Sequence, residues 1–478
     1  MNRRKIAFAG RKRASKPWEG LLVMLAVLVF STEGRAQDSH YWTHQYGTRS
    51  TLLGGAMIGN VTDISAAYYN PGGLAVIADP QLILGARVYD FTTITANTRV
   101  GEEEVIDTDS EQFKRAPGFF GVRLPLAFLG DHHLAISTFS RQEFSFGVSE
   151  RRVNTDEEVA GLTNLAAFLG EASFNQSLNE TWYGLTWSHT WGEHAGIGIS
   201  HFLAIRKQRS SVNVKAEVLT MEDEGLISTQ EEAVKFLNYR LVWKLGLAYQ
   251  RSPIGVGVAI TTPSLNLSGT GSSWRNAILF GVDLDGDGAE DPIFDANLQD
   301  GLEAFYSSPL SMAVGVTARL ESWALHVSGE WFNKVPSFDV LRLEAYQGQS
   351  SGEVRSPSVA HRLDAVLNGA VGLEKTFSEQ FQGFVSFATD FSGAVSGDQN
   401  ILFLSEWDLF HLTTGTSFSL GQARFTLGVG YAFGSETEPR SFLLNEVSER
   451  NLFFDVPAGT GLTYRRWKFI IGFEYDTN

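Results

Sequence analysis

The sequence contains no cysteine among its 478 residues. Disulfides and thiolate metal sites are therefore excluded, although an exported protein would be free to form disulfides. Basic residues are also scarce: 38 Lys and Arg stand against 54 Asp and Glu, which gives a formal charge of −16 and disfavours nucleic acid as a partner. Beyond residue 30, no apolar run reaches the length of about 20 residues that a membrane-spanning helix needs.

The first 36 residues have the pattern of a cleaved export signal. Seven Lys and Arg residues precede an apolar run over 21–30, and residues 34–36 are Gly, Arg and Ala, which suit a cleavage site. The alternative, an inner-membrane anchor, requires a longer apolar run. We therefore expect residues 1–36 to be removed, which would change the formal charge from −16 to −22 because eight basic and two acidic side chains leave with them.

Signatures of common catalytic sites are missing from the sequence. We find no HExxH zinc motif, no phosphate-binding loop, no complete GxGxxG and no GxSxG nucleophile elbow. His326 and Glu330 share one face of a predicted strand, but a separation of four strand residues places them about 13 Å apart, too far for an acid–base pair. We expect a protein that is not an enzyme and that needs no cofactor.

Glycine, aromatic residues and alternation are what the sequence has in abundance. It holds 48 Gly, 34 Phe, 13 Tyr and 11 Trp, yet its mean hydropathy is only −0.08. In several segments every second residue is apolar and the residues between are mostly small or polar, which predicts β-strands with one apolar face. These segments are 243–250, 254–261, 312–320, 425–433 and 467–475.

The residues between the apolar ones indicate which face meets water. In a soluble two-sheet protein they would be large and charged, whereas here many are small, as in Thr426, Gly428, Gly430 and Ala432. A transmembrane barrel has this pattern when another segment partly fills its lumen. We therefore expect the apolar side chains to face lipid. The alternative to a membrane barrel is a soluble periplasmic β-protein.

The predicted strands are joined alternately by short and long connections, as in outer-membrane barrels, which have short periplasmic turns and long extracellular loops. Short links occur at 130–131, 192–193, 251–253, 321–322, 378–379 and 420–421, and long polar stretches cover 97–114, 149–174, 220–232, 269–305, 335–360, 393–404 and 434–450. The predicted fold class is all-β, a transmembrane antiparallel barrel of about 14 strands, a number that should be even. Whether 451–476 form one strand or two stays open.

Residues 37–80 do not alternate and are rich in small residues. They contain Leu53-Gly54-Gly55-Ala56, Asp63-Ile64-Ser65-Ala66 and, above all, Asn70-Pro71-Gly72-Gly73-Leu74. This element, between an export signal and a barrel pattern, resembles the FadL family of outer-membrane transporters of long-chain fatty acids and other hydrophobic molecules. The family has Asn-Pro-Ala here, so Gly72 departs from its pattern. Beyond this element the resemblance is one of architecture and length.

The resemblance implies a barrel, residues 81–478, whose lumen is closed by an N-terminal hatch, residues 37–80. It also implies that a hydrophobic groove between helical extracellular loops captures the ligand. The ligand would then pass inside the barrel and leave sideways into the membrane, through a gap in the wall, once the hatch moves. A polar interruption of the third predicted strand, residues 140–143, indicates either a distorted wall or the extracellular half of a long strand.

Three segments are predicted to be helical from apolar spacings of three and four. A weaker helix covers 222–236, and the two stronger faces consist of Leu162, Leu165, Ala166 and Leu169, and of Phe294, Leu298, Leu302 and Phe305. By the resemblance, we take the last four residues as the candidate ligand groove. The alternative is that the helices only pack on one another.

Polar candidates complete the prediction. Lys244, Arg319 and Arg424 alternate with lipid-facing residues and should point into the lumen, where a carboxylate head group would need a cation; an ordinary polar network is the alternative. Asp283, Asp285, Asp287 and Asp291 have the spacing of a calcium loop, but Phe294 replaces the final Glu of that motif. We expect either a weak extracellular calcium site or a solvated acidic turn.

Together these patterns favour passive uptake of long-chain fatty acids or other hydrophobic small molecules through a plugged barrel in the cell outer membrane. The partners would be the ligand and outer-membrane lipid, with no nucleic acid. The alternative function is that of a FadL-like barrel that serves as a shuttle for protein cargo, as in type IX secretion.

Overall fold

The structure is a computed structural model of the chain. Two compact units are distinguished, Met1–Glu33 and Gly34–Asn478, and every described residue belongs to the second. The expected export signal therefore lies outside the described residues. The structure describes residues 40–475 except 78–81, 85–86, 101–103, 116–117, 155–157, 160–161, 221–224, 282–289, 396–401, 403–406, 437–460 and the single positions 125, 127, 129, 164, 291, 351 and 422.

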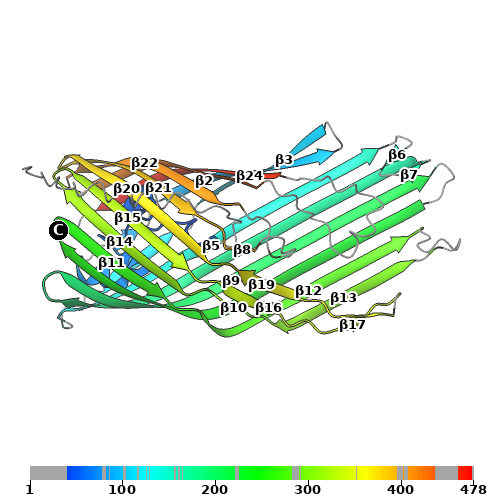
Figure 1. The fold of residues 1–478 in the computed structure, drawn as a ribbon, viewed down its shortest axis with the longest axis horizontal. Coiled ribbons are helices and arrows are strands. Elements are labelled where there is room, and N and C mark those ends of the chain that lie inside the picture. Colours follow the sequence, from blue (N-terminus) through cyan, green and yellow to red (C-terminus); the bar gives the residue numbers. More distant parts are fainter. Residues whose placement is uncertain are drawn as a thin grey trace, which may run out of the picture. The chain divides into compact units, whose positions relative to one another are not determined.

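Most of the described strands belong to one antiparallel sheet (Figure 1). They are β1 (Leu82–Leu84), β2 (Arg87–Val100), β3 (Glu104–Arg115), β4 (Phe119–Leu124), β5 (His132–Asn154), β8 (Leu165–Trp191), β9 (Ala195–Thr220), β10 (Gly225–Arg251), β11 (Ile254–Thr261), β12 (Leu265–Phe280), β13 (Ile293–Glu303), β14 (Ser311–Leu320), β15 (Trp323–Phe332), β20 (Val366–Ser378), β21 (Phe381–Asp390), β22 (Leu409–Leu420), β23 (Ala423–Glu436) and β24 (Gly461–Tyr475). Three small sheets pair β6 (Glu158–Val159) with β7 (Leu162–Thr163), β16 (Val335–Leu341) with β19 (Val359–Leu363), and β17 (Tyr346–Gln347) with β18 (Val354–Arg355).

The large sheet closes into a barrel. Its described strands make about 14 antiparallel passes when those that continue one another are counted together, namely β1 with β2, β3 with β4, β11 with β12, and β13 with β14. The last pass returns to the first, because β24 pairs with β2 from Arg87–Ile471 to Asn97–Gly461. The predicted fold class and even strand number are confirmed, and the described part of 451–476 is one strand.

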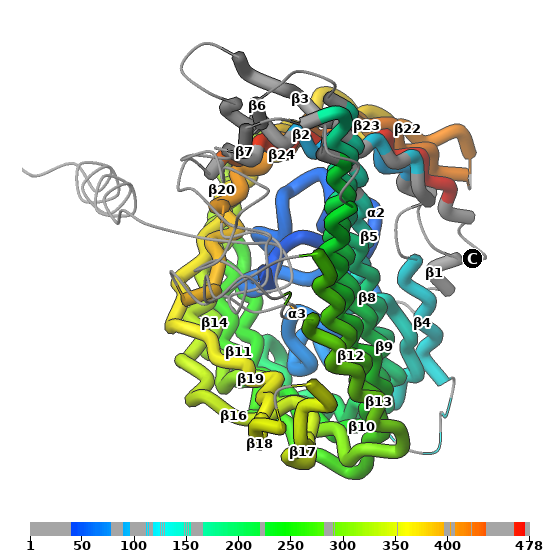
Figure 2. The backbone as a smooth tube through the Cα atoms, turned by 90° about the vertical axis from the view of Figure 1, so that its right-hand side faces the viewer, coloured from blue at the N-terminus to red at the C-terminus, as the bar shows by residue number. Residues whose placement is uncertain are grey.

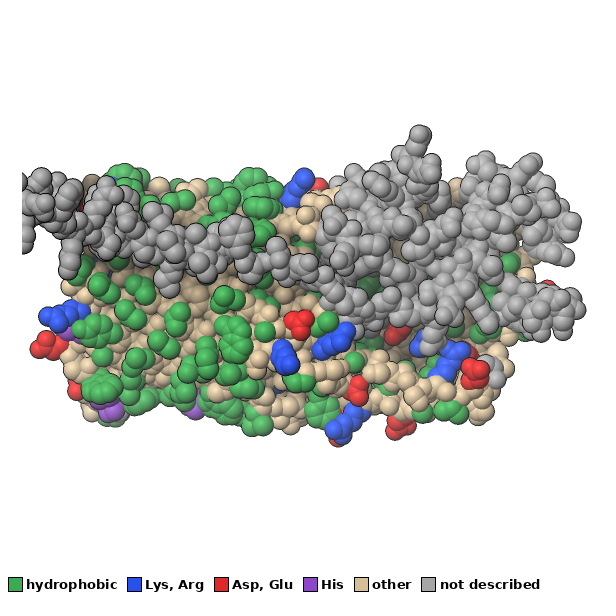
Figure 3. All heavy atoms as spheres, in the orientation of Figure 1, with side chains coloured by type: hydrophobic (Ala, Val, Ile, Leu, Met, Phe, Trp, Pro, Cys, Tyr) green, Lys and Arg blue, Asp and Glu red, His purple; other side chains and the backbone are tan. Residues whose placement is uncertain are grey.

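Alternation along the strands follows the predicted faces. In β14, Met312, Val314 and Val316 are exposed, whereas Ala313 and Thr317 between them are buried. Large apolar side chains therefore cover the outside of the barrel, and small ones face its inside. Figure 3 shows hydrophobic side chains spread over the half of the visible face that holds β11, β14 and β15, with charged side chains at its two borders. This is the opposite of a dry two-sheet core, in which the large apolar side chains would meet one another across the space between the sheets.

Strand lengths differ strongly around the barrel. β8 and β10 have 27 residues each and β9 has 26, so each is about 90 Å long at about 3.3 Å per residue. A membrane-spanning strand needs only about 9–11 residues. Figure 1 shows β5, β8, β9, β10, β12 and β13 continuing well beyond the ends of β14, β15 and β20. A part of the sheet thus extends past any membrane layer at the end opposite the short turns.

The short links are confirmed as turns between consecutive strands, but several predicted long loops are wrong. The described parts of 97–114, 149–174, 220–232 and 269–305 are largely strand, and 335–360 contains the small pairs β16–β19 and β17–β18. These segments lack the regular apolar alternation of the other strands, so their sequences look like loops. Their backbone groups are satisfied by neighbouring strands instead.

The three predicted loop helices are also wrong. The described residues of 162–169 lie in β7 and β8 and those of 222–236 in β10, and 294–305 lie mostly in β13. A spacing of four residues is even, so Phe294, Leu298 and Leu302 fit one face of a strand as well as one face of a helix. Pairing with β12 decides in favour of the strand. No helix in the described part of the chain is long and apolar enough to cross a membrane.

Candidate functional site

Residues 40–77 lie inside the barrel. They form two short helices, α2 (Thr48–Leu52) and α3 (Ala66–Tyr69), and a 3-10 helix, η1 (Pro71–Ala75), and nearly all of their side chains are buried. Figure 2 shows this luminal segment within the ring of strands. Its tight path requires glycine, because Gly54 and Gly55 have φ angles of 62° and 83°, which other residues rarely adopt.

The predicted hatch motif, residues 70–74, is buried against the barrel wall. Asn70 Nδ2 donates to Ile58 O at 3.1 Å and to Leu247 O of β10 at 2.9 Å, and its Oδ1 accepts from Gly72 N at 3.2 Å. One amide therefore joins two parts of the luminal segment to the wall. Asparagine suits this position because its side chain both donates and accepts.

Glycine lines the wall where the motif packs. A Cβ added to Gly198 of β9 would lie 2.5 Å from Pro71 O, and one added to Gly72 would lie 2.5 Å from Gly196 O and 2.8 Å from Gly246 O. These contacts are with backbone atoms, which cannot turn aside, so glycine on both sides allows the close approach. The small inward residues noted in the sequence thus make room for the luminal segment. The departure at Gly72 from the family's alanine has the same cause.

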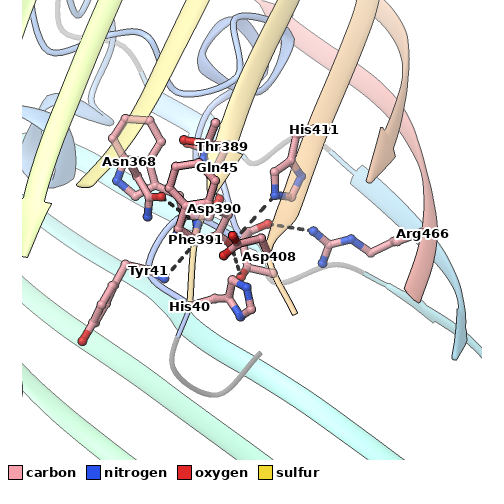
Figure 4. A network of polar contacts seen from close by, with 12 residues as sticks. His40, Tyr41, Gln45, Asn368, Thr389, Asp390, Phe391, Asp408, His411 and Arg466 are labelled. Carbon is pink, nitrogen blue, oxygen red and sulfur yellow. Dashed lines mark hydrogen bonds and ion pairs between the residues drawn. The ribbon is translucent and has the colours of Figure 1, made fainter. Parts of the chain in front are cut away.

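A buried carboxylate anchors the start of the luminal segment. Asp390, the last residue of β21, accepts through Oδ1 from the backbone N–H groups of Tyr41 at 3.1 Å and Trp42 at 2.7 Å, and through Oδ2 from Thr43 Oγ1 at 2.6 Å. His411 Nε2 lies 3.8 Å from Oδ2, and Figure 4 shows Tyr41 and His411 on either side of Asp390. A buried charge is tolerated only with such partners, so this contact fixes where the segment enters the lumen.

Two further carboxylates of the wall hold the luminal segment. Glu330 of β15 accepts from Trp42 Nε1 at 2.9 Å, and Lys244 Nζ of β10 lies 3.8 Å from its other oxygen. Arg49 of α2 forms an ion pair of 2.6 Å with Glu374 of β20. These contacts between segment and wall are polar and can exchange for water if the segment moves, but they stand beside a buried apolar cluster in which segment residues such as Tyr46 pack against wall residues such as Phe139.

The wall is irregular at β5. The register between β5 and β8 shifts between Ser140 and Gln142, so Arg141 is an extra residue, a β-bulge. Both Arg141 and Gln142 consequently face the lumen, and the ladder from β4 ends at Phe139, just before the bulge. The polar interruption seen in the sequence therefore marks a distorted wall, and β5 also continues as a long strand to Asn154.

A small cavity lies between the luminal segment and the bulge. It has a volume of about 50 Å³, and its lining combines aromatic Tyr41, Tyr68, Trp182 and Phe332 with charged Arg141, Glu180, Lys244 and Glu330. The Arg141 guanidinium lies 5.7 Å from the Tyr68 ring and 5.8 Å from the Trp182 ring. Among the described residues, no carboxylate lies within ion-pair distance of Arg141.

Another part of the cavity wall is built on buried arginines. Glu180 Oε2 of β8 lies 3.0 Å from Arg206 Nη1 and 2.8 Å from Arg240 Nη2. Tyr306, which follows β13, lies under both guanidinium groups, at 3.9 and 4.6 Å from its ring centroid. The stretch after β13 is therefore held over the lumen by charge and ring contacts.

The predicted groove residues do not share one surface. Phe294 and Leu298 are exposed, Leu302 packs near Phe236, and the Phe305 ring lies 4.6 Å from the Arg342 guanidinium. The loss of the predicted helix explains this, because the register shift in the β12–β13 ladder and the end of β13 separate the four positions. Their role in ligand capture stays an untested prediction.

Of the predicted lumen cations, Lys244 lines the cavity, whereas Arg319 and Arg424 lie exposed beside short turns. Both arginines have the same parity as the inward-facing residues of their strands, but Arg319 lies at the end of β14 and Arg424 at the start of β23, so both are exposed. The calcium-loop candidates, Asp283, Asp285, Asp287 and Asp291, all lie outside the described residues.

His326 and Glu330 belong to two different clusters of polar contacts, as their spacing along the strand predicts. His326 Nε2 lies 3.4 Å from Glu374, and its Nδ1 lies 2.9 Å from Thr317 Oγ1, whereas Glu330 contacts Trp42 and Lys244. Sequence reasoning missed Arg141 as a lumen residue. Only the bulge turns it inward, and the polar interruption at 140–143 was the signal that could have found it.

Comparison with known proteins supports the fold. No family model and no curated protein sequence matches the chain. Among solved structures, a Pseudomonas aeruginosa FadL homologue is 11% identical with a TM-score of 0.57, covering 92% of this chain and 100% of that one. The P. putida toluene transporter TodX is 13% identical with a TM-score of 0.55, covering 91% and 99%. The monoaromatic hydrocarbon channel CymD is 10% identical with a TM-score of 0.51, covering 91% and 98%. The chain thus has the fold of FadL-type barrels.

Proposed function

We propose that this chain is an outer-membrane transporter of the FadL family and that it takes up hydrophobic small molecules with an acidic head group, such as long-chain fatty acids, by passive diffusion. The observation that carries the proposal is the cavity beside the β5 bulge, where an arginine without a carboxylate partner among the described residues meets aromatic walls. Residues 1–36 would direct export, and the luminal segment would act as the hatch.

The outer surface has the dimensions that a membrane demands. On β10 the outward apolar residues run from Leu237 to Tyr249, which corresponds to about 41 Å along the strand and, at a tilt of about 45°, to a height of about 29 Å. Outer-membrane barrels carry an apolar band about 25 Å tall. Tyr239, Tyr249 and Trp191 lie near its two edges, where amphipathic rings prefer to lie.

The lining of the cavity suits an amphipathic ligand. Each methylene of a fatty acid that leaves water gains about 0.8 kcal/mol, which aromatic walls supply without precise contacts. The carboxylate would pair with Arg141, with Lys244 as a second cation. These two residues replace Arg319 and Arg424 in the proposed head-group role. Because the cavity is small, the luminal segment would have to shift before a long chain fits.

The β5 bulge also offers a route out. The β4–β5 ladder stops at Phe139, and the bulge at Arg141 lies two residues farther along β5. A ligand whose head is held by Arg141 would therefore lie beside the place where the wall is interrupted. From there it would leave sideways into the membrane, as the resemblance to FadL implies.

Uptake into lipid vesicles tests the proposal. Vesicles with the purified barrel should take up palmitate faster than empty vesicles. Arg141→Gln should weaken palmitate binding at least about tenfold, equivalent to about 1.4 kcal/mol, but leave binding of methyl palmitate unchanged. Arg319→Gln is the matched control, because that arginine is exposed at a turn. Equal palmitate binding by both variants would refute the head-group site.

Toluene provides the contrasting ligand, because two of the similar structures carry the names of a toluene transporter and a monoaromatic hydrocarbon channel. Uptake of toluene with no uptake of palmitate would replace the acidic ligand by a neutral aromatic one. No uptake of either ligand, together with a folded protein bound to the purified barrel, would favour the cargo-shuttle alternative.

A further inference from the structure

Three basic side chains gather on the outer face of the barrel just beyond its apolar belt. They are Lys207 and Arg209 of β9 and Lys235 of β10. In the β9–β10 ladder Arg209 stands directly opposite Lys235, and Lys207 stands opposite Leu237. Like charges directly opposite each other destabilise a sheet, so this arrangement calls for an explanation outside the sheet itself.

Charges of the protein do not neutralise this basic row. Among the described residues, none of the three cations has a carboxylate within ion-pair distance, whereas Lys215, farther along β9, pairs with Glu217 at 2.6 Å. The row is also unusual for a chain whose formal charge is −16. An external anion is the simplest partner for it.

The basic row borders a groove that crosses neighbouring strands. The groove has a volume of about 590 Å³ and is lined by residues of β5, β8, β9, β10, β12 and β13. On the side of β9 away from Lys235 lie the polar groups of Ser177 and Asn179, which are the β8 partners of Arg209 and Lys207. Two acidic residues line the groove as well, Glu143 on β5 and Asp300 on β13. These are the two outermost strands of the groove, so the charged groove residues of β9 and β10 between them are all basic.

The height of the basic row identifies the anion. Tyr239 and Ile205 are the last outward pair in which both side chains are apolar, and in the next outward pair Leu237 stands opposite Lys207. That step is about 7 Å along the strand, which places the cations at the level of lipid head groups rather than of acyl chains.

We propose that Lys207, Arg209 and Lys235 bind the phosphate groups of a phosphorylated lipid in the membrane leaflet at the loop end of the barrel. The acyl chains of this lipid would lie on the apolar belt below, and its head group would occupy the groove. The inference rests on the membrane placement in the proposed function, but it concerns the outer surface and not the transport path.

Native mass spectrometry of the whole barrel in detergent tests the site, with lipid A, a glycolipid that carries two phosphates, as the probe. The wild type should retain lipid A, and the variant with Lys207→Gln, Arg209→Gln and Lys235→Gln should bind it at least tenfold more weakly. Lys215→Gln is the matched control and should bind as the wild type does. Lipid A stripped of its phosphates should bind the wild type as weakly as lipid A binds the triple variant.

Several outcomes would overturn the proposal. Equal lipid A binding by the wild type and the triple variant would do so, as would equal binding of the dephosphorylated lipid. Competition by inorganic phosphate at low millimolar concentration would show a site for free phosphate instead of a lipid. A folded barrel shifts its mobility on heating in SDS, and a triple variant without this shift has not folded. In that case the wild type alone tests the proposal: added salt should weaken its binding of lipid A but not its binding of the dephosphorylated lipid.

Vesicle uptake separates this proposal from the proposed function. The triple variant should take up palmitate like the wild type, since the basic row lies outside the lumen. Failure of palmitate uptake with retained lipid A binding would reject the transport proposal alone. Normal uptake with no preference for phosphorylated lipid would reject the lipid site alone.

Discussion

Removal of the Asn70 side chain should release the luminal segment from the wall. Asn70→Ala deletes three hydrogen bonds, to Ile58 O, to Leu247 O and from Gly72 N. At about 1 kcal/mol for each bond, the docked segment loses about 3 kcal/mol relative to a segment that has both left the wall and opened, because two of the three bonds lie within the segment itself. Since about 1.4 kcal/mol is a factor of ten, the undocked population should rise about 100-fold.

Hydrogen–deuterium exchange of the purified barrel measures this population. The N–H groups of Tyr69 and Asn70 donate to Ser65 O and Ala66 O within the luminal segment, at 3.0 Å each. They exchange when the segment undocks and opens, so their exchange rates should rise about 100-fold in Asn70→Ala. Asn70→Asp should have at least as large an effect, because a carboxylate cannot donate to the two carbonyl oxygens.

Asn60 supplies the matched control within the same segment. Its side chain is buried, and neither atom of its amide has a hydrogen-bond partner in the described part of the chain. Asn60→Ala should therefore change exchange at residues 69 and 70 far less than Asn70→Ala does. Equal exchange in the wild type and Asn70→Ala, or equal effects of the two alanine variants, would refute the view that Asn70 docks the segment.

Three further predictions concern charge and burial. Glu180→Ala should lower the free energy of unfolding by about 3–5 kcal/mol, because Arg206 and Arg240 remain buried without their carboxylate; an unchanged urea midpoint would contradict this. Val314→Arg should cost about 2–4 kcal/mol in lipid vesicles if this exposed side chain faces the bilayer centre, and no cost would place it in water. Burial, followed by repulsion from Arg206 and Arg240, lowers the pKa of His361 well below its usual value. Because the histidine is charged more readily once exposed, acidification below about pH 6.5 should favour opening of the β16–β19 pair. Limited proteolysis should therefore cleave this pair faster at pH 5 than at pH 7, and His361→Leu should remove the difference.

The sequence by itself determined the barrel and its faces. In alternation such as Met312-Ala313-Val314, the residues between the large apolar ones are small instead of charged. This pattern indicates a barrel with an apolar outer face and an inner face of small residues. The Asn70 motif was likewise readable, because a compact, glycine-rich stretch ahead of alternating strands has no strand pattern of its own. Both signals are local, so one chain suffices to see them.

Tertiary structure alone decided where the strands end and which polar groups meet. Phe294, Leu298 and Leu302 fit a helix or a strand equally well until pairing with β12 selects the strand. Arg141 faces the lumen because a one-residue bulge changes the alternation of β5, and a bulge depends on the register with the neighbouring strand. Such outcomes come from backbone hydrogen bonds between distant segments, whose partners no local pattern specifies.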